Sequence, residues 1–131
     1  MATGLENLWV YKLAEDLEVE VHHVTKQFPR DEFFRSIDQL RRSSASVGNN
    51  IAESYHKTTT KEKIRFLDIA KGEAEETKRN LIKSVRKGLG SHEIIDLIIE
   101  RYTVVLKGLH AYQKFLELNE TNNRLTKTKN K

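Results

Sequence analysis

The sequence predicts an all-α protein, folded as an up-and-down antiparallel four-helix bundle. Three observations predict this fold. Apolar residues recur three and four positions apart in four long segments, as they do on the buried face of a helix. Short turns join these segments, so successive helices are expected to be antiparallel neighbours. The chain of 131 residues is 32% charged and contains one proline and no cysteine, which suits one soluble helical domain without disulfides.

The first helix is expected to run from about Asn7, a residue type favoured at N-caps, to Gln27. A turn at Phe28-Pro29 ends it, because the residue before a proline is disfavoured in the helical conformation. The apolar residues that we expect to line one face of this helix are Val10, Leu13, Ala14, Leu17, Val21, Val24 and Phe28.

The second helix, from about Asp31 to Tyr55, is expected to be the central one. Its apolar stripe is surrounded by Ser, Ala and Gly, and small side chains let other backbones approach on more than one side. The residues of the stripe are Phe33, Ile37, Leu40, Ser44, Val47 and Ile51. A polar ladder of Arg42, Asn49 and Glu53 lies on the opposite face. We interpret this ladder as structural pairing, within the bundle or across subunits, and ligand contact is the alternative.

The third helix is expected to begin near Thr60, because Thr59 and Glu62 have the spacing of a capping box. Glycines end it at Gly88-Leu89-Gly90, since glycine readily adopts the left-handed conformation that closes a helix. Its predicted core residues are Leu67, Ala70, Ala74, Thr77, Leu81 and Val85.

The fourth helix, capped by Ser91 and extending to about Leu118, is the most apolar. Its heptad seam consists of Ile95, Ile98, Tyr102, Val105, Leu109, Tyr112 and Leu116. A second apolar line holds Leu97, Val104, Ala111 and Phe115, with Gly108 beside it, and Ile99 and Leu106 form a third patch. A peripheral helix of a monomeric bundle needs one stripe. We therefore expect a homo-oligomer.

Composition divides the chain into a bundle domain, residues 1–118, and a tail, residues 119–131. The tail is rich in Asn, Thr and Lys, and we expect it to be basic and disordered.

The positive charge is concentrated in two regions. Residues 58–87 carry a net charge of +4 and residues 119–131 a net charge of +3, whereas the whole chain carries +4. The candidate phosphate-binding residues are Lys61, Arg65, Arg79, Lys83, Arg86, Lys87, Lys127 and Lys129. The alternative is a solvated face with ion pairs one turn apart. Since no element for reading base edges is recognisable, any binding is expected to be weakly sequence-specific.

No motif indicates an enzyme, a cofactor or a metal site. The sequence contains no nucleophile elbow and no glycine-rich phosphate loop. Two Glu-x-x-His pairs, Glu20 with His23 and Glu53 with His56, resemble those of di-iron bundles. They lie near opposite ends of antiparallel helices, roughly 30 Å apart, which argues against a shared metal.

Neither a membrane span nor a signal peptide is recognisable. The apolar runs fall short of the roughly 20 residues that span a bilayer, and the first residues lack a basic start followed by an apolar core. We expect a cytoplasmic protein without a membrane partner.

Several motifs resemble a known family. They are Leu8-Trp9-Val10-Tyr11-Lys12-Leu13-Ala14, Phe28-Pro29-x-x-Glu32, Gln39-Leu40-Arg41-Arg42-Ser43, Asn50-Ile51-Ala52-Glu53 and Arg65-Phe66-Leu67-Asp68-Ile69-Ala70-Lys71-Gly72. In order and spacing they resemble the bacterial four-helix bundle family named after the intervening sequences of 23S ribosomal RNA genes. Ser54 and Glu73 depart from the family pattern, which has glycine and serine there, and Glu73 adds negative charge near the basic helix.

The resemblance implies a homopentamer encoded in a context like that of a 23S rRNA intervening sequence, with no established activity. A distant relative, the accessory protein of diversity-generating retroelements, is a basic pentamer that binds nucleic acid and a reverse transcriptase. From the residues and the resemblance together we expect a non-enzymatic oligomer that binds structured RNA or DNA. The alternative is a scaffold that binds a partner protein and no nucleic acid.

Overall fold

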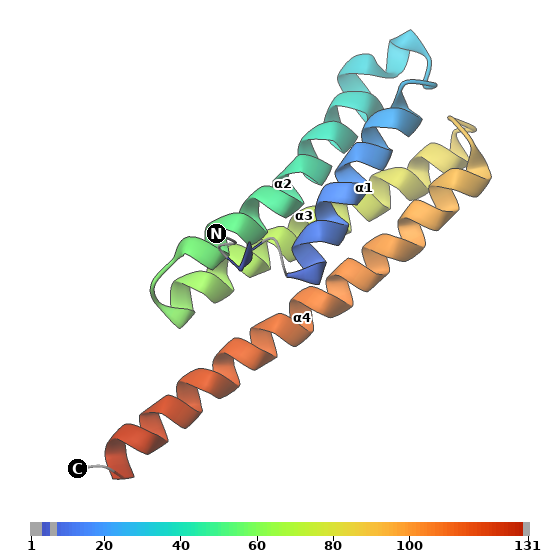
Figure 1. Ribbon diagram of the computed structural model, residues 1–131. Helices are drawn as coiled ribbons and strands as arrows, with labels where there is room; N and C mark the ends of the chain where they lie inside the picture. The colour runs from blue at the N-terminus through green and yellow to red at the C-terminus, as the bar shows by residue number, and fades with distance from the viewer. Residues whose placement is uncertain (1–3, 6–7, 130–131) are drawn as a thin grey trace.

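A computed structural model describes residues 4–5 and 8–129, with side chains up to Leu125. The four α-helices are α1 (Trp9–Thr25), α2 (Asp38–His56), α3 (Thr60–Arg86) and α4 (His92–Lys129). Each contacts the next along the chain, and α1 also contacts α4, so the helices form a closed bundle (Figure 1). The described residues contain no strand. The predicted all-α four-helix fold is confirmed.

The predicted core faces are buried. On α1 every predicted residue is buried except Leu13, which is half-buried. Leu67, Ala70, Ala74, Thr77 and Leu81 of α3 are fully buried, and Val85 is half-buried. On α4 the heptad seam is buried from Ile95 to Leu109 and half-buried at Tyr112 and Leu116. Three- and four-residue spacing therefore located the core correctly.

The small side chains of α2 do bring neighbours close on two sides, because α2 packs against both α1 and α3. Its buried serines are satisfied locally: Ser43 and Ser54 donate to the carbonyl oxygens three residues earlier, at 3.5 and 2.6 Å. The hydroxyls of Ser43 and Thr77 also share a hydrogen bond of 2.7 Å that joins α2 to α3.

The start of the second helix differs from the prediction. A 3-10 turn, η2 (Arg30–Glu32), and a π-helix, η3 (Phe33–Ile37), precede α2. A π turn contains more residues than an α turn. The side chains at the start of η3 therefore point in a different direction from the apolar stripe of α2. Phe33 is consequently 51% exposed, although the sequence placed it in the core. The predicted cap Asn7 lies outside the described residues.

The turns around α3 follow the prediction. The Thr59 side chain accepts a hydrogen bond from the Glu62 backbone amide at 3.2 Å. At the other end Gly88 has a φ of 74° and Gly90 a φ of 65°. The Ser91 side chain accepts from the Ile94 amide at 3.4 Å, and α4 begins at the following residue.

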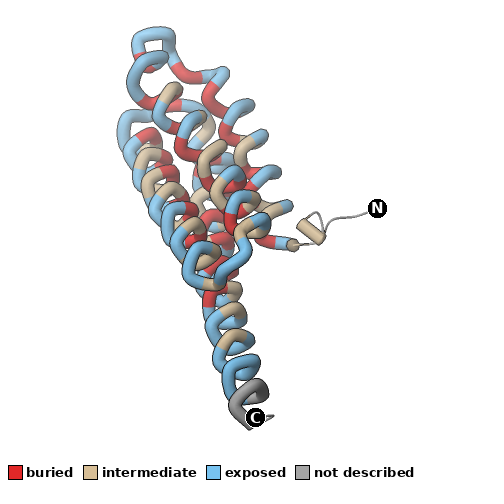
Figure 2. Tube along the Cα trace, turned by 90° about the vertical axis from the view of Figure 1, so that its left-hand side faces the viewer, coloured by how far each residue is buried: buried red, intermediate tan, exposed pale blue. Residues whose placement is uncertain are grey.

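The predicted end of the last helix at Leu118 is wrong, because α4 continues to Lys129. Neither glycine nor proline follows Gly108, so nothing in the sequence interrupts the helix there. An ion pair of 2.9 Å between Arg124 and Glu120, one turn apart, supports the extension. After Gln113 no described residue is buried (Figure 2). Residues 119–129 are thus helical, where we predicted disorder.

Candidate nucleic-acid interface and assembly face

The basic side chains predicted to bind phosphate are exposed on α3 and the residue after it. They lie on the side of α3 opposite its core face, and that core face consists of small and aliphatic residues. The exposed residues are Lys61, Arg65, Arg79, Lys83, Arg86 and Lys87. Lys127 and Lys129 belong to the last turns of α4, and their side chains lie outside the described part of the structure.

These residues form two clusters rather than one stripe. The first cluster is Lys61 and Arg65, and the second is Arg79, Lys83, Arg86 and Lys87. Arg79 lies fourteen positions after Arg65, which is about 21 Å along a helix axis. Acidic Asp68, Glu75 and Glu76 lie between the clusters. Each end of α3 therefore presents its own positive surface.

In the second cluster, Lys83, Arg86 and Lys87 line a shallow groove of about 370 Å³. Lys87 Nζ lies 3.5 Å from the carboxylate of Glu32, which also accepts a hydrogen bond of 2.7 Å from the Ser36 hydroxyl. The hydrogen bond from Ser36 and the charge of Lys87 lower the pKa of Glu32. Among the described residues, Lys83 and Arg86 form no ion pair and remain available for an external anion.

In the first cluster, Lys61 and Arg65 line a wider groove of about 720 Å³ beside the α2–α3 turn, and the carboxylates of Glu62 and Asp68 line it as well. The ring of Phe66 lies beneath two cations: Lys57 Nζ is 5.0 Å and Arg65 Cζ 5.2 Å from its centre. Such contacts restrain long basic side chains at the surface. Of the two cations over the ring, Lys57 is also paired with Glu53 at 3.8 Å, whereas Arg65 forms no ion pair among the described residues.

The polar ladder is not buried. Arg42, Asn49 and Glu53 are all exposed. Arg42 lies 3.5 Å from Asp38 and Glu53 lies 3.8 Å from Lys57, each one turn away on the same helix. Exposed pairs of this kind contribute little to stability. Among the described residues the ladder thus forms ion pairs only within α2 and at its end, and pairing between helices or across subunits stays a prediction.

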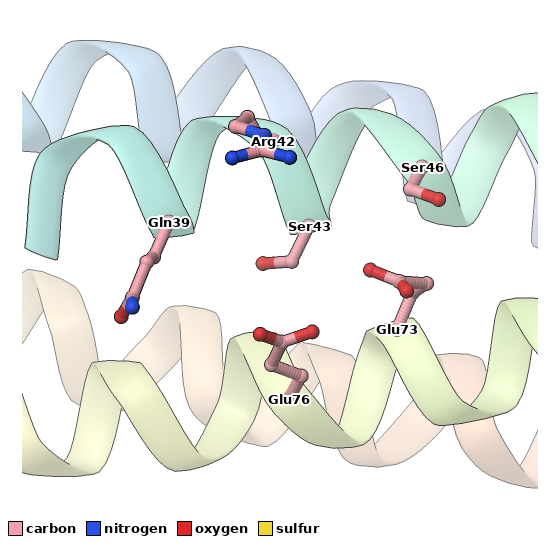
Figure 3. Close-up of a pocket in the computed structure, with 6 residues that line it drawn as sticks. All are labelled: Gln39, Arg42, Ser43, Ser46, Glu73 and Glu76. Atoms are coloured by element: carbon pink, nitrogen blue, oxygen red, sulfur yellow. The ribbon is translucent and has the colours of Figure 1, made fainter. Parts of the chain in front are cut away.

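An acidic groove of about 440 Å³ separates the two basic clusters. It lies between α2 and α3, and Figure 3 shows Glu73 and Glu76 of α3 pointing toward α2. Partial burial and the charge of Glu76 raise the pKa of Glu73. The sequence did not reveal this groove, because its two walls belong to segments about 30 residues apart. The complete lining is Gln39, Arg42, Ser43, Ser46, Glu73 and Glu76.

The second apolar line of α4 remains uncovered in the single chain. Its large residues Leu97, Val104 and Phe115 are 45–60% accessible. Three exposed residues outside the predicted line, Ile94, Leu118 and Leu125, extend it at heptad spacing and past the bundle. Together with exposed Ala111, we call them the apolar face of α4. Gly108, by contrast, is covered by the Trp9 ring of α1, and the third patch, Ile99 and Leu106, packs against the core.

This architecture and these motifs agree with a family comparison. A family model described as 23S rRNA-intervening sequence protein matches residues 6–111. The chain belongs to the 23S rRNA-intervening sequence protein family.

A solved structure shows the same fold. This member of the 23S rRNA-intervening sequence protein family is similar to a protein of unknown function from the S23 ribosomal protein family of Bacteroides thetaiotaomicron VPI-5482. The two chains are 26% identical with a TM-score of 0.74, and the match covers 80% of this chain and 98% of the other. None of the curated proteins matches this chain.

The described residues contain neither a metal-binding cluster nor a membrane-spanning helix. No group of three or more His, Asp or Glu side chains there is placed to hold a metal ion. Within the same residues, none of the helices combines the length and apolar character required to cross a bilayer.

Proposed function

We propose that this family member is a non-enzymatic, cytoplasmic homo-oligomer that binds structured RNA or DNA through the two basic clusters of α3. The observation that carries the proposal is the arrangement of those clusters. Five of their six side chains, all except Lys87, form no ion pair among the described residues and point away from the core. Charges left unpaired at a surface are available to replace the counterions of a phosphate backbone.

Affinity and specificity follow from this arrangement. Lysine and arginine side chains that contact phosphates position a protein on nucleic acid without reading its sequence. Each phosphate neutralised on duplex DNA steepens the salt dependence of log K by about 0.9. Binding should therefore be weakly sequence-specific and strongly weakened by salt.

Assembly multiplies the clusters. The apolar face of α4 runs from Ile94 to Leu125 at heptad spacing, and apolar area of this extent is costly to leave in water. A second copy supplies the same face and can cover it, as in coiled coils. The family resemblance favours five copies. A ring of such copies would present ten basic clusters to one nucleic acid molecule.

The test is fluorescence anisotropy with labelled ribosomal RNA and duplex DNA across a salt series. Binding at low salt that weakens as salt rises supports the proposal. The double variants Lys83→Ala/Arg86→Ala and Lys61→Ala/Arg65→Ala should each bind more weakly and show a shallower salt slope. Lys12→Ala/Lys114→Ala removes the same charge from exposed positions on other helices and serves as the matched control. No binding of either nucleic acid at low salt would refute the proposal.

A scaffold role is the second candidate, favoured by the same apolar face of α4. In that case the face binds a different protein and the basic clusters are merely solvated. Substituting Leu97 and Val104 by lysine would then abolish capture of the partner in a pull-down. Under the leading proposal the same variant changes the mass of the oligomer and, through it, the avidity for nucleic acid.

A further inference from the structure

Two adjacent phenylalanines on η3 are left in solvent. Phe34 is 86% exposed and Phe33 is 51% exposed, and their rings stand edge to face with centres 4.9 Å apart. An exposed phenylalanine forgoes the favourable free energy that burial of its ring would provide. The π-helix that displays them is itself a rare element, which is often found at functional sites.

The aromatic pair lies beside the second basic cluster. Glu32, directly before Phe33 in sequence, contacts Lys87 Nζ at 3.5 Å. Ser36, two residues after Phe34, donates a hydrogen bond to the same carboxylate. This contact joins the start of η3 to the end of α3, and both lie at the same end of the bundle (Figure 1). Arg30 and Arg35, which flank the pair in sequence, are exposed as well.

This combination of ring faces and cations matches one ligand chemistry. Unpaired nucleotides expose flat bases and carry phosphates, and proteins bind them by stacking aromatic rings on the bases and placing cations along the backbone. Base-paired nucleotides offer no free base face to an outside ring. Arg30 and Arg35 flank the pair in sequence, and Lys83 and Arg86 lie one turn or less before Lys87, which contacts Glu32; all four cations are exposed, as is the carboxylate of Asp31.

We propose that Phe33 and Phe34 stack on unpaired bases while Lys83 and Arg86 bind the adjoining phosphates. This inference rests on the proposed nucleic-acid binding and narrows its ligand to single-stranded segments, such as the loops of a structured RNA. The charge around the pair favours a polyanion over an apolar protein surface, for which the neighbouring cations would have to be desolvated.

The experiment compares a labelled single strand of about 12 nucleotides, within the usual span of such sites, with a duplex of the same length. The variants are Phe34→Leu, which keeps an apolar side chain without a ring, and Phe34→Tyr, which keeps the ring. Phe34→Leu should weaken single-strand binding by about 5- to 150-fold, the range that follows from removal of a stacking ring. Phe34→Tyr should bind like the wild type, and the duplex affinity of both should change by no more than about twofold, since duplex binding uses phosphate contacts alone.

Two further variants complete the design. Val19→Ala shortens an exposed apolar residue of α1 and should leave both affinities unchanged. Lys83→Ala/Arg86→Ala should weaken single-strand and duplex binding together, because both carry phosphates. Since Phe34 is 86% exposed, its substitution is expected to leave the fold intact, which circular dichroism would check.

The outcomes separate the two proposals. If the wild type binds both ligands and Phe34→Leu binds the single strand equally well, stacking is refuted while the proposed function stands. If the wild type binds neither ligand, both proposals fail. If Phe34→Leu changes the mass of the oligomer in light scattering rather than its affinity, the pair is a contact between subunits and the stacking proposal is overturned.

Discussion

Gln113 on α4 donates a hydrogen bond of 2.7 Å from its side-chain nitrogen to the carboxylate of Asp68 on α3. Its side-chain oxygen accepts a second bond, of 2.9 Å, from Lys71 Nζ. The amide nitrogen also lies 3.4 Å from the carbonyl oxygen of Ile64. Gln113 is the last buried residue of α4 among those described. It therefore fixes the register of α3 against α4 just before α4 leaves the bundle.

Replacing Gln113 by leucine should lower the free energy of unfolding by about 1–3 kcal/mol, because its hydrogen bonds to the charged groups of Asp68 and Lys71 are lost. Chemical denaturation measures the change. Gln39→Leu, at an exposed position of α2, should change the stability by less than about 0.5 kcal/mol. Equal effects of the two substitutions would show that Gln113 holds no register.

Tyr102 is fully buried, and apart from a weak interaction with the Ser44 side chain its hydroxyl is unsatisfied among the described residues. Burial raises the pKa of this phenol, so it stays neutral. Tyr102→Phe removes the unsatisfied group and should leave the free energy of unfolding unchanged or raise it by about 1 kcal/mol. Tyr102→Ala should lower it by about 3–5 kcal/mol through the cavity it creates. A loss above about 1 kcal/mol in Tyr102→Phe would reveal a partner for the hydroxyl.

Glu32 should make the fold sensitive to acid. Its pKa lies below the ordinary value of 4.5, chiefly because Ser36 donates to the carboxylate and secondarily because of Lys87. A lowered native pKa stabilises the fold above the unfolded pKa, and this stability is lost as the pH falls through the native pKa. Unfolding followed from pH 7 to pH 2 should therefore depend less on pH in Glu32→Gln than in the wild type. Ser36→Ala should shift the profile in the same direction, and an unchanged slope in both variants would contradict the assignment.

Three glycines should respond differently to alanine. Nothing lies within 4 Å of a Cβ built at Gly72, which sits inside α3, so Gly72→Ala should stabilise the protein by about 0.5–1 kcal/mol. Gly88 has a positive φ and open space, so its replacement should cost about 1–2 kcal/mol. Gly90→Ala should cost more than Gly88→Ala, because the new Cβ would also lie 2.8 Å from the Phe28 ring. Thermal unfolding ranks the variants, and a different order would refute these explanations.

Local signals in the sequence were sufficient for most of the fold. The Thr59–Glu62 cap, the glycines after α3 and the periodic core faces depend on residues close together in the chain. The π-helix was missed because Phe33 has the same spacing from Ile37 as an α-helical core residue, and only the added residue per turn rotates it outward. The extension of α4 was missed because a polar composition without glycine or proline is compatible with both disorder and helix.

The candidate site was predicted less completely. The exposure of the α3 cations followed from their position opposite the core. Their division into two clusters around an acidic groove depends on how α2 and α3 pair, which spacing along one helix cannot provide. The contact between Lys87 and Glu32 joins residues more than 50 positions apart. The sequence alone therefore could not place the aromatic pair next to the second basic cluster.

Light scattering of the purified protein, alone and with ribosomal RNA, tests the central claim most directly. That claim is that the apolar face of α4 joins several copies, which then share their basic clusters. It predicts a mass several times that of the 15.2 kDa chain at micromolar concentration, five copies if the family resemblance holds, and a larger complex when RNA is added at low salt. A stable, folded species of 15.2 kDa whose mass does not change with RNA would contradict it.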